Sequence, residues 1–112
     1  MAELTFVVTL SHFNPEVEGL TTDTLNEFRN VLSGILTFVG FGPRLDDNDI
    51  WGNQFAIPIT NIYENGVLTI EYMWEYPLHH GGYLSSNVIP PLLRWAQEQD
   101  LHLTTRLIYE TL

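Results

Sequence analysis

Residues 54–76 read QFAIPITNIYENGVLTIEYMWEY. The dipeptide Asn65-Gly66 separates two runs in which apolar and polar side chains alternate. Both residues tolerate positive φ, as a type I′ turn requires, so the pattern predicts a β-hairpin. The first strand, residues 54–63, contains Pro58, which has no N–H to donate, and we therefore expect it at a sheet edge. The second, residues 67–76, should direct alternate side chains to one face, namely Leu68, Ile70, Tyr72, Trp74 and Tyr76.

The segments on either side of this hairpin alternate between strand and helix patterns. Residues 4–10 alternate like a strand with one buried face. Thr24 followed by Glu27 fits a capping box, and apolar residues then recur at helical spacing as far as Val39. After a loop at residues 77–85, in which Gly81-Gly82 lets the chain turn, Pro90 and Pro91 suit the first turn of a helix ending at Gln99. Residues 101–109 form a last strand, with four side chains expected inward: Leu101, Leu103, Leu107 and Tyr109.

The resulting order of elements is strand, helix, strand, strand, helix, strand, and we expect one domain over residues 1–112. This order resembles the ferredoxin-like fold over nearly the whole chain. The resemblance implies an α+β structure in which two helices cover one face of a four-stranded antiparallel sheet. It also implies the strand order 4-1-3-2, which places the second strand at an edge, as Pro58 does independently. Such a fold hosts many functions and selects none of them.

The charge balance is the strongest functional signal in the composition. Among 112 residues there are fourteen Asp and Glu, four Arg and no Lys, which gives a formal net charge of −10. The resulting field repels nucleic acid and anionic membranes and attracts basic protein surfaces. The absence of Cys excludes thiol chemistry and fits the cytoplasm, and we expect neither a signal peptide nor a membrane span.

The sheet face opposite the helices should carry much of this charge. We expect ten residues there: Glu3, Thr5, Val7, Glu71, Met73, Glu75, His102, Thr104, Arg106 and Glu110. Glu71 and Glu75 lie four residues apart on one strand, a span of roughly 13 Å and close to two phosphate steps. One interpretation is a nucleic-acid mimic that occupies a basic groove, and the other is an ordinary solvated strand face.

A second cluster of polar residues is expected at one end of the sheet. There His79 and His80 would approach the loop that contains Asp46, Asp47, Asp49 and Trp51. Imidazole and carboxylate groups could bind a divalent metal or act as a general base. No metal-binding or nucleophile motif supports this, and no Lys or Arg lies between Arg44 and Arg94 to hold a phosphate. We therefore expect no cofactor.

Two functional hypotheses follow from these observations. The first is a small non-enzymatic protein that inhibits a basic, nucleic-acid-handling protein, as nuclease inhibitors, immunity proteins and phage anti-defence antagonists do. Its carboxylates would steer association, and Trp51 or Tyr83 would supply an apolar anchor. The contact residues would be Glu71, Glu75, Asp46, Asp47, Asp49, Trp51 and Tyr83. The alternative is a homodimeric ligand-binding or enzymatic domain, paired through the open sheet face, with a site at His79, His80 and Asp49.

Overall fold

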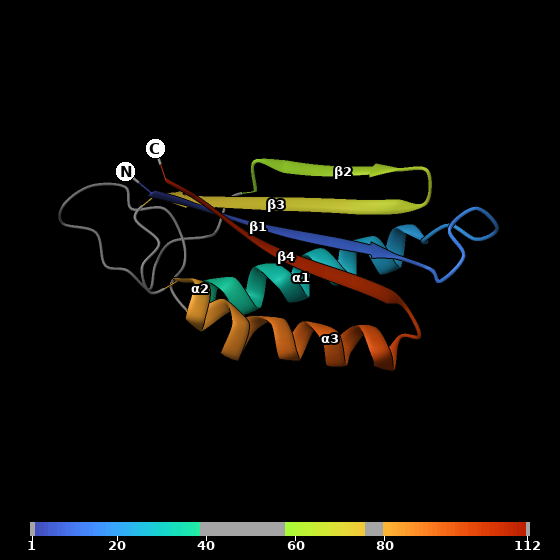
Figure 1. Ribbon diagram of the computed structural model, residues 1–112. Helices are drawn as coiled ribbons and strands as arrows, with labels where there is room; N and C mark the ends of the chain where they lie inside the picture. The colour runs from blue at the N-terminus through green and yellow to red at the C-terminus, as the bar shows by residue number, and fades with distance from the viewer. Residues whose placement is uncertain (1, 39–57, 76–79, 112) are drawn as a thin grey trace.

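A computed structural model of the chain describes residues 2–38, 58–75 and 80–111 (Figure 1). The elements are, in order, β1 (Ala2–Ser11), α1 (Thr22–Phe38), β2 (Thr60–Glu64), β3 (Val67–Glu75), α2 (His80–Tyr83), the π-helical segment η2 (Leu84–Val88), α3 (Ile89–Glu98) and β4 (His102–Thr111). Several predictions concern residues that lie outside these ranges, namely Val39, Asp46, Asp47, Asp49, Trp51, Tyr76 and His79.

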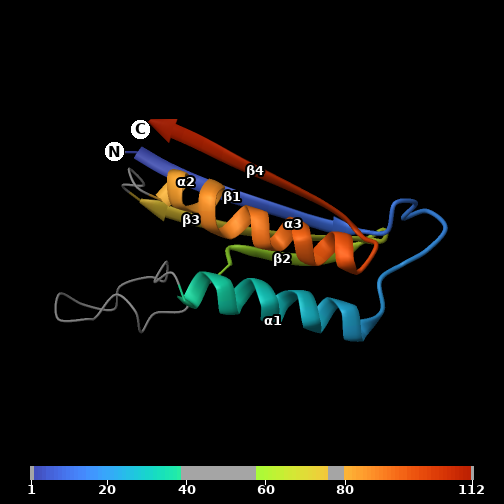
Figure 2. The same cartoon turned by 90° about the horizontal axis from the view of Figure 1, so that it is seen from below.

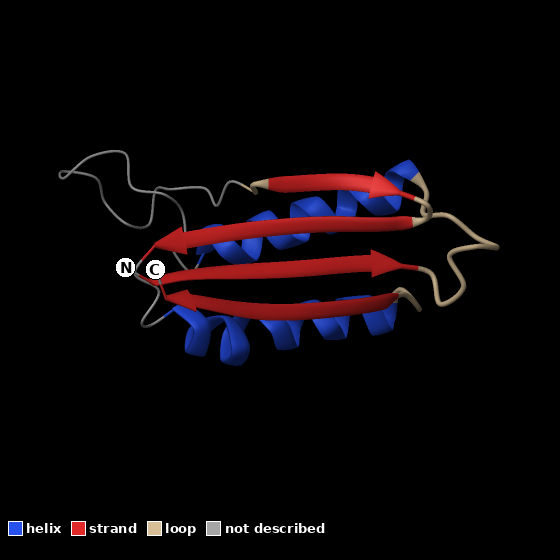
Figure 3. Cartoon of the chain, turned by 45° about the horizontal axis from the view of Figure 1, so that its top comes forward, coloured by secondary structure: helices blue, strands red, loops and turns tan. Residues whose placement is uncertain are grey.

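The four strands form one sheet in the order β2-β3-β1-β4, and every neighbouring pair is antiparallel. Read from β4, this order is 4-1-3-2, and β2 lies at an edge as expected. Helices α1 and α3 lie side by side against the same face of the sheet (Figure 2). The opposite face carries no described helix (Figure 3). The predicted α+β class, with a four-stranded antiparallel sheet, is therefore confirmed.

The core lies between the sheet and the helices. Every second residue of β1, from Leu4 to Leu10, is fully buried, as the alternation predicted. Helix α1 contributes Leu25, Phe28, Leu32 and Leu36, and α3 contributes Leu92 and Ala96. Burial of this apolar stripe supplies most of the favourable free energy that holds the helices on the sheet.

The hairpin has the predicted turn, since φ is 53° at Asn65 and 81° at Gly66. Strand β2 is shorter than expected and begins at Thr60. Pro58 precedes it, so placing Pro58 within the strand was wrong. Backbone bonding to β3 begins at Ile59, whose N–H donates to the Glu71 carbonyl over 2.7 Å. The hydrogen-bond ladder between β2 and β3 therefore starts just after Pro58, the residue that has no N–H to donate.

Helix α1 begins one turn earlier than the capping box predicted. The Oγ1 atom of Thr21 accepts a hydrogen bond from the Thr24 N–H over 3.1 Å, which makes Thr21 the N-cap. Glu27 lies well inside the helix, and its Oε1 accepts a bond from Trp95 Nε1 over 3.4 Å. Its carboxylate thus links α1 to α3 rather than capping α1.

The loop expected at residues 77–85 is helical from His80 onward, so the prediction that Gly81-Gly82 forms a turn was wrong. The helical path runs without a break through α2, η2 and α3. Pro90 and Pro91 occupy the first positions of α3. Because neither has an N–H for the preceding turn, the wider π segment falls immediately before them.

Strand β4 departs from expectation at its last inward position. Leu101 and Leu103 are buried and Leu107 is half-buried, but Tyr109 is 61% exposed. Tyr109 lies near the end of an edge strand, where the helix layer covers only part of its ring. Its hydroxyl group lies over Gly81, at the start of α2.

Candidate acidic binding face

The sheet face that points away from the helices is called the open face. Cross-strand pairing and burial together assign its residues. They are Glu3, Thr5, Val7 and Thr9 of β1; Thr60, Ile62 and Glu64 of β2; Val67, Thr69, Glu71 and Met73 of β3; and His102, Thr104, Arg106, Ile108 and Glu110 of β4. Glu75 continues the β3 series by its register.

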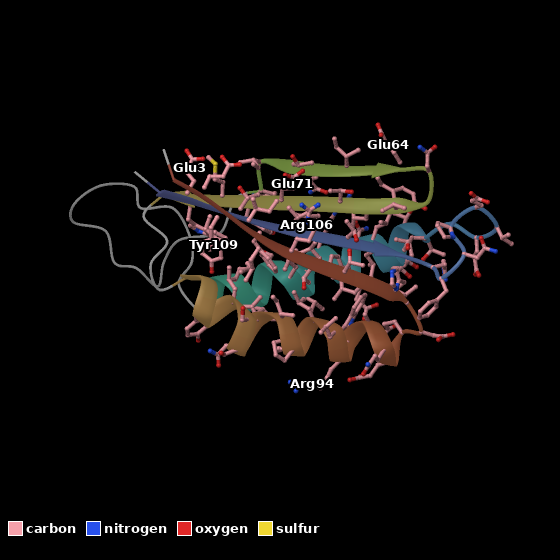
Figure 4. The ribbon with its side chains drawn as sticks, viewed as in Figure 1. Glu3, Glu64, Glu71, Arg94, Arg106 and Tyr109 are labelled. Carbon is pink, nitrogen blue, oxygen red and sulfur yellow. The ribbon has the colours of Figure 1, made fainter. Side chains whose placement is uncertain are left out.

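Three glutamates share one cross-strand row at the end of the open face nearest the termini. Glu3 of β1 pairs with Glu75 of β3 on one side and with Glu110 of β4 on the other. Glu3 is half-buried and Glu110 is exposed, and Figure 4 shows Glu3 at this end of the sheet. Like charges directly opposite one another on neighbouring strands destabilise a sheet. This set is called the glutamate row.

The charge pattern changes two rows further along the sheet. Val7 pairs with Glu71 on one side and Arg106 on the other. The two charged residues are therefore two strand spacings apart, roughly 10 Å between backbones. Arg106 is the one Arg or Lys among the described residues of the open face, and Figure 4 labels it together with Glu71.

Neutral side chains occupy the next row. Thr9 pairs with Thr69 and with Thr104, and the hydroxyl groups of Thr9 and Thr104 are hydrogen-bonded. Ile62 lies opposite Thr69 on β2 and is 49% exposed. The open face thus changes from an acidic end to a threonine-rich, partly apolar middle.

The predicted contact residues do not all lie on one surface. Glu71 and Glu75 belong to β3, and Glu71 is half-buried on the open face. Tyr83 belongs to α2 in the helix layer, on the opposite side of the sheet, where it is 38% exposed. Asp46, Asp47, Asp49 and Trp51 lie outside the described residues.

The structure places Glu3 and Glu110 in one cross-strand row, which the sequence patterns did not predict. Both were expected on the open face, but the position of Glu3 between Glu75 and Glu110 depends on the register of β1 with β3 and β4. Along an antiparallel pair of strands, the numbers of two paired residues always add up to the same value. That value would have placed the three glutamates in one row, but the sequence alone does not give it.

Within residues 2–38, 58–75 and 80–111, no group of three His, Asp or Glu side chains is arranged to hold a metal ion. One His–carboxylate contact joins His12 and Glu18 over 3.7 Å in the loop after β1. None of the described helices is both long enough and apolar enough to cross a membrane.

Comparison of the chain with protein-family models, with curated proteins and with solved structures found no significant match.

Proposed function

We propose that this chain is a small non-enzymatic binding protein that neutralises a basic, nucleic-acid-handling partner in the cytoplasm. The open face is its contact surface, and the glutamate row is the centre of that contact. A nuclease inhibitor, an immunity protein and a phage anti-defence antagonist all fit this description. The strand order and the antiparallel pairings support assigning its scaffold to the ferredoxin-like class.

The observation that carries the proposal is the pairing of Glu3 with both Glu75 and Glu110. Glu3 and Glu110 carry like charges at directly opposed positions, and Glu75 holds the third position of the row by its backbone register. Like charges placed in this way lower the stability of a sheet. A basic partner removes that repulsion because each carboxylate can pair with an Arg or Lys. The row is therefore suited to a bound state better than to the isolated molecule.

The mechanism is electrostatic steering followed by local pairing. A net charge of −10 accelerates encounter with a basic surface over distances up to about a Debye length, roughly 10 Å at 0.1 M salt. Arg side chains of the partner would then form bidentate bonds with carboxylates of the row. Arg106 would lie outside the contact centre and restrict the orientations in which a basic partner docks.

The proposal is tested by capturing partners from a lysate of the source organism on the immobilised chain at low and high salt. The test variant is Glu3→Gln/Glu75→Gln/Glu110→Gln. Its control removes the same number of charges elsewhere, through Glu16→Gln/Glu18→Gln/Glu98→Gln in the loop after β1 and on α3. Captured protein is then eluted with duplex DNA, which competes for a basic nucleic-acid-binding groove.

We expect the wild type and the control to retain one basic protein that high salt or DNA releases. The test variant should bind that protein at least about tenfold more weakly. Equal binding by both variants would reject the glutamate row as the contact, and capture that neither salt nor DNA reverses would reject the proposed function.

A further inference from the structure

The free edge of β4 is the second surface of this molecule that suggests a partner. Within residues 2–38, 58–75 and 80–111, β4 ends the strand order and no strand pairs with its outer edge. Figure 2 shows β4 as the outermost described strand, with α3 lying on its inner side. It spans ten residues, His102–Thr111, and contains no proline. A long edge strand presents a row of unpaired N–H and C=O groups that can template another strand.

The other sheet edge is protected by comparison. β2 has five residues, and Pro58 lies two residues before its start at Thr60. Its residue Asn61 accepts a hydrogen bond from Arg29 Nε of α1 over 3.1 Å. A short strand bonded to a helix and preceded by proline is a poor template, so additional strand pairing is favoured at β4.

The sequence of β4 is complementary to itself. Arg106, Ile108 and Glu110 lie at alternate positions on the open face. If two copies pair antiparallel about Ile108, Arg106 of each copy lies opposite Glu110 of the other, and the two Ile108 residues face each other. Directly opposed residues have Cβ atoms about 4.5–5.5 Å apart, close enough for an ion pair.

The helix side of β4 fits the same register. Leu107 would lie opposite Tyr109 of the second copy, and the symmetry repeats this contact. Tyr109 is 61% exposed and Leu107 is half-buried, so both have apolar surface left to bury. A shift of the centre to Arg106 would instead place two guanidinium groups opposite one another, which is destabilising.

We propose that two copies of this chain pair through β4, centred on Ile108, to form one continuous eight-stranded antiparallel sheet. The twofold axis is perpendicular to the sheet, so both helix layers lie on one side and both open faces on the other. This contact uses the edge strand and does not cover the open face, but it pairs Glu110 of the glutamate row with Arg106 of the other copy. The dimer is argued from the sequence of β4 and not from the proposed function, and the two proposals share that one residue.

The test measures molecular mass by sedimentation velocity over a range of protein concentrations. We expect the mass to rise from 12.9 kDa toward twice that value as concentration increases. Arg106→Glu should raise the dimer dissociation constant at least about tenfold, because it turns two attractive pairs into two repulsive ones. Arg106→Glu/Glu110→Arg should restore the dimer, since the exchanged charges again oppose each other.

The matched control is Arg106→Glu/Glu64→Arg, which has the same net charge as the exchanged variant but places the new Arg on β2, at the far edge. It should remain as weakly associated as Arg106→Glu, and circular dichroism should confirm that all variants fold. A wild type that is monomeric up to millimolar concentration would overturn the proposal. A dimer that Arg106→Glu does not weaken, or that Glu64→Arg rescues as well as Glu110→Arg, would also overturn it.

Discussion

The backbone of Gly81 passes so close to Tyr109 that no side chain fits between them. A Cβ at position 81 would overlap the Tyr109 hydroxyl group and lie 2.7 Å from its Cζ. This contact joins the start of α2 to the end of β4 and explains why glycine occupies a buried helical position. Glycine costs about 1 kcal/mol relative to alanine inside a helix, so its presence there reflects the tyrosine ring above it.

Gly81→Ala should therefore change stability with opposite sign in two backgrounds. With Tyr109 present, we expect a loss of about 1–2 kcal/mol, because the ring must swing away from α2. With Tyr109→Ala, we expect the same change to stabilise by up to about 1 kcal/mol through helix propensity. Urea unfolding of the four proteins measures this double-mutant cycle. Additive effects would show that Gly81 and Tyr109 are not coupled.

Thr21→Ala should lower the free energy of unfolding by about 1 kcal/mol. The change removes the acceptor for the Thr24 N–H and the hydrogen bond between the two threonine hydroxyl groups. Glu27→Gln should cost less, because Gln retains an oxygen that can accept the bond from Trp95 Nε1. Thermal or urea unfolding compares the variants. If Glu27→Gln lowered the free energy of unfolding more than Thr21→Ala does, Thr24 and Glu27 would be the capping pair instead.

Stability should fall at alkaline pH because of Tyr72. This side chain is 4% exposed, and burial raises the pKa of its phenol from 10.0 to about 12. The unfolded state therefore releases this proton at a lower pH than the folded state does. Its contribution to stability is complete below pH 10 and is lost as the pH rises toward 12.

The Tyr72→Phe variant separates this effect from general alkaline denaturation. Spectrophotometric titration of tyrosinate absorbance should lose the highest-pH transition in the variant. Its stability should also decline less steeply between pH 10 and 12, even if removal of the hydroxyl changes stability uniformly at lower pH. Identical slopes for both proteins in that interval would contradict the assignment.

The glutamate row should make the free protein less stable than a variant in which one of its charges is removed. Glu3→Gln is expected to raise the free energy of unfolding by about 0.2–1 kcal/mol, since Glu3 lies between Glu75 and Glu110. Glu98→Gln, on α3, should have a smaller effect. Urea unfolding at low and high salt measures both, and the gain should shrink as salt screens the repulsion. A destabilised Glu3→Gln variant would show that the row is not repulsive.

Much of this architecture could be predicted from local patterns. Alternation identified the buried side chains of β1, and Asn65-Gly66 located the hairpin, because each signal depends on residues adjacent in the chain. Three local patterns gave a wrong prediction. The alternation through Pro58 predicted a strand over residues 54–63, but β2 begins only at Thr60. Gly81-Gly82 resembles a turn but is helical, and Thr24 with Glu27 resembles a cap although Thr21 fulfils that role.

The sequence by itself determined which side chains point inward, where the hairpin turns and how strongly acidic the protein is, since side-chain period, turn chemistry and charge are local properties. Only the tertiary structure decided that Glu3 lies between Glu75 and Glu110, that Arg106 shares a row with Glu71, and that Tyr109 covers Gly81. These relationships join segments far apart in the chain. They depend on strand register and helix placement, which packing of the whole core selects and no short pattern encodes.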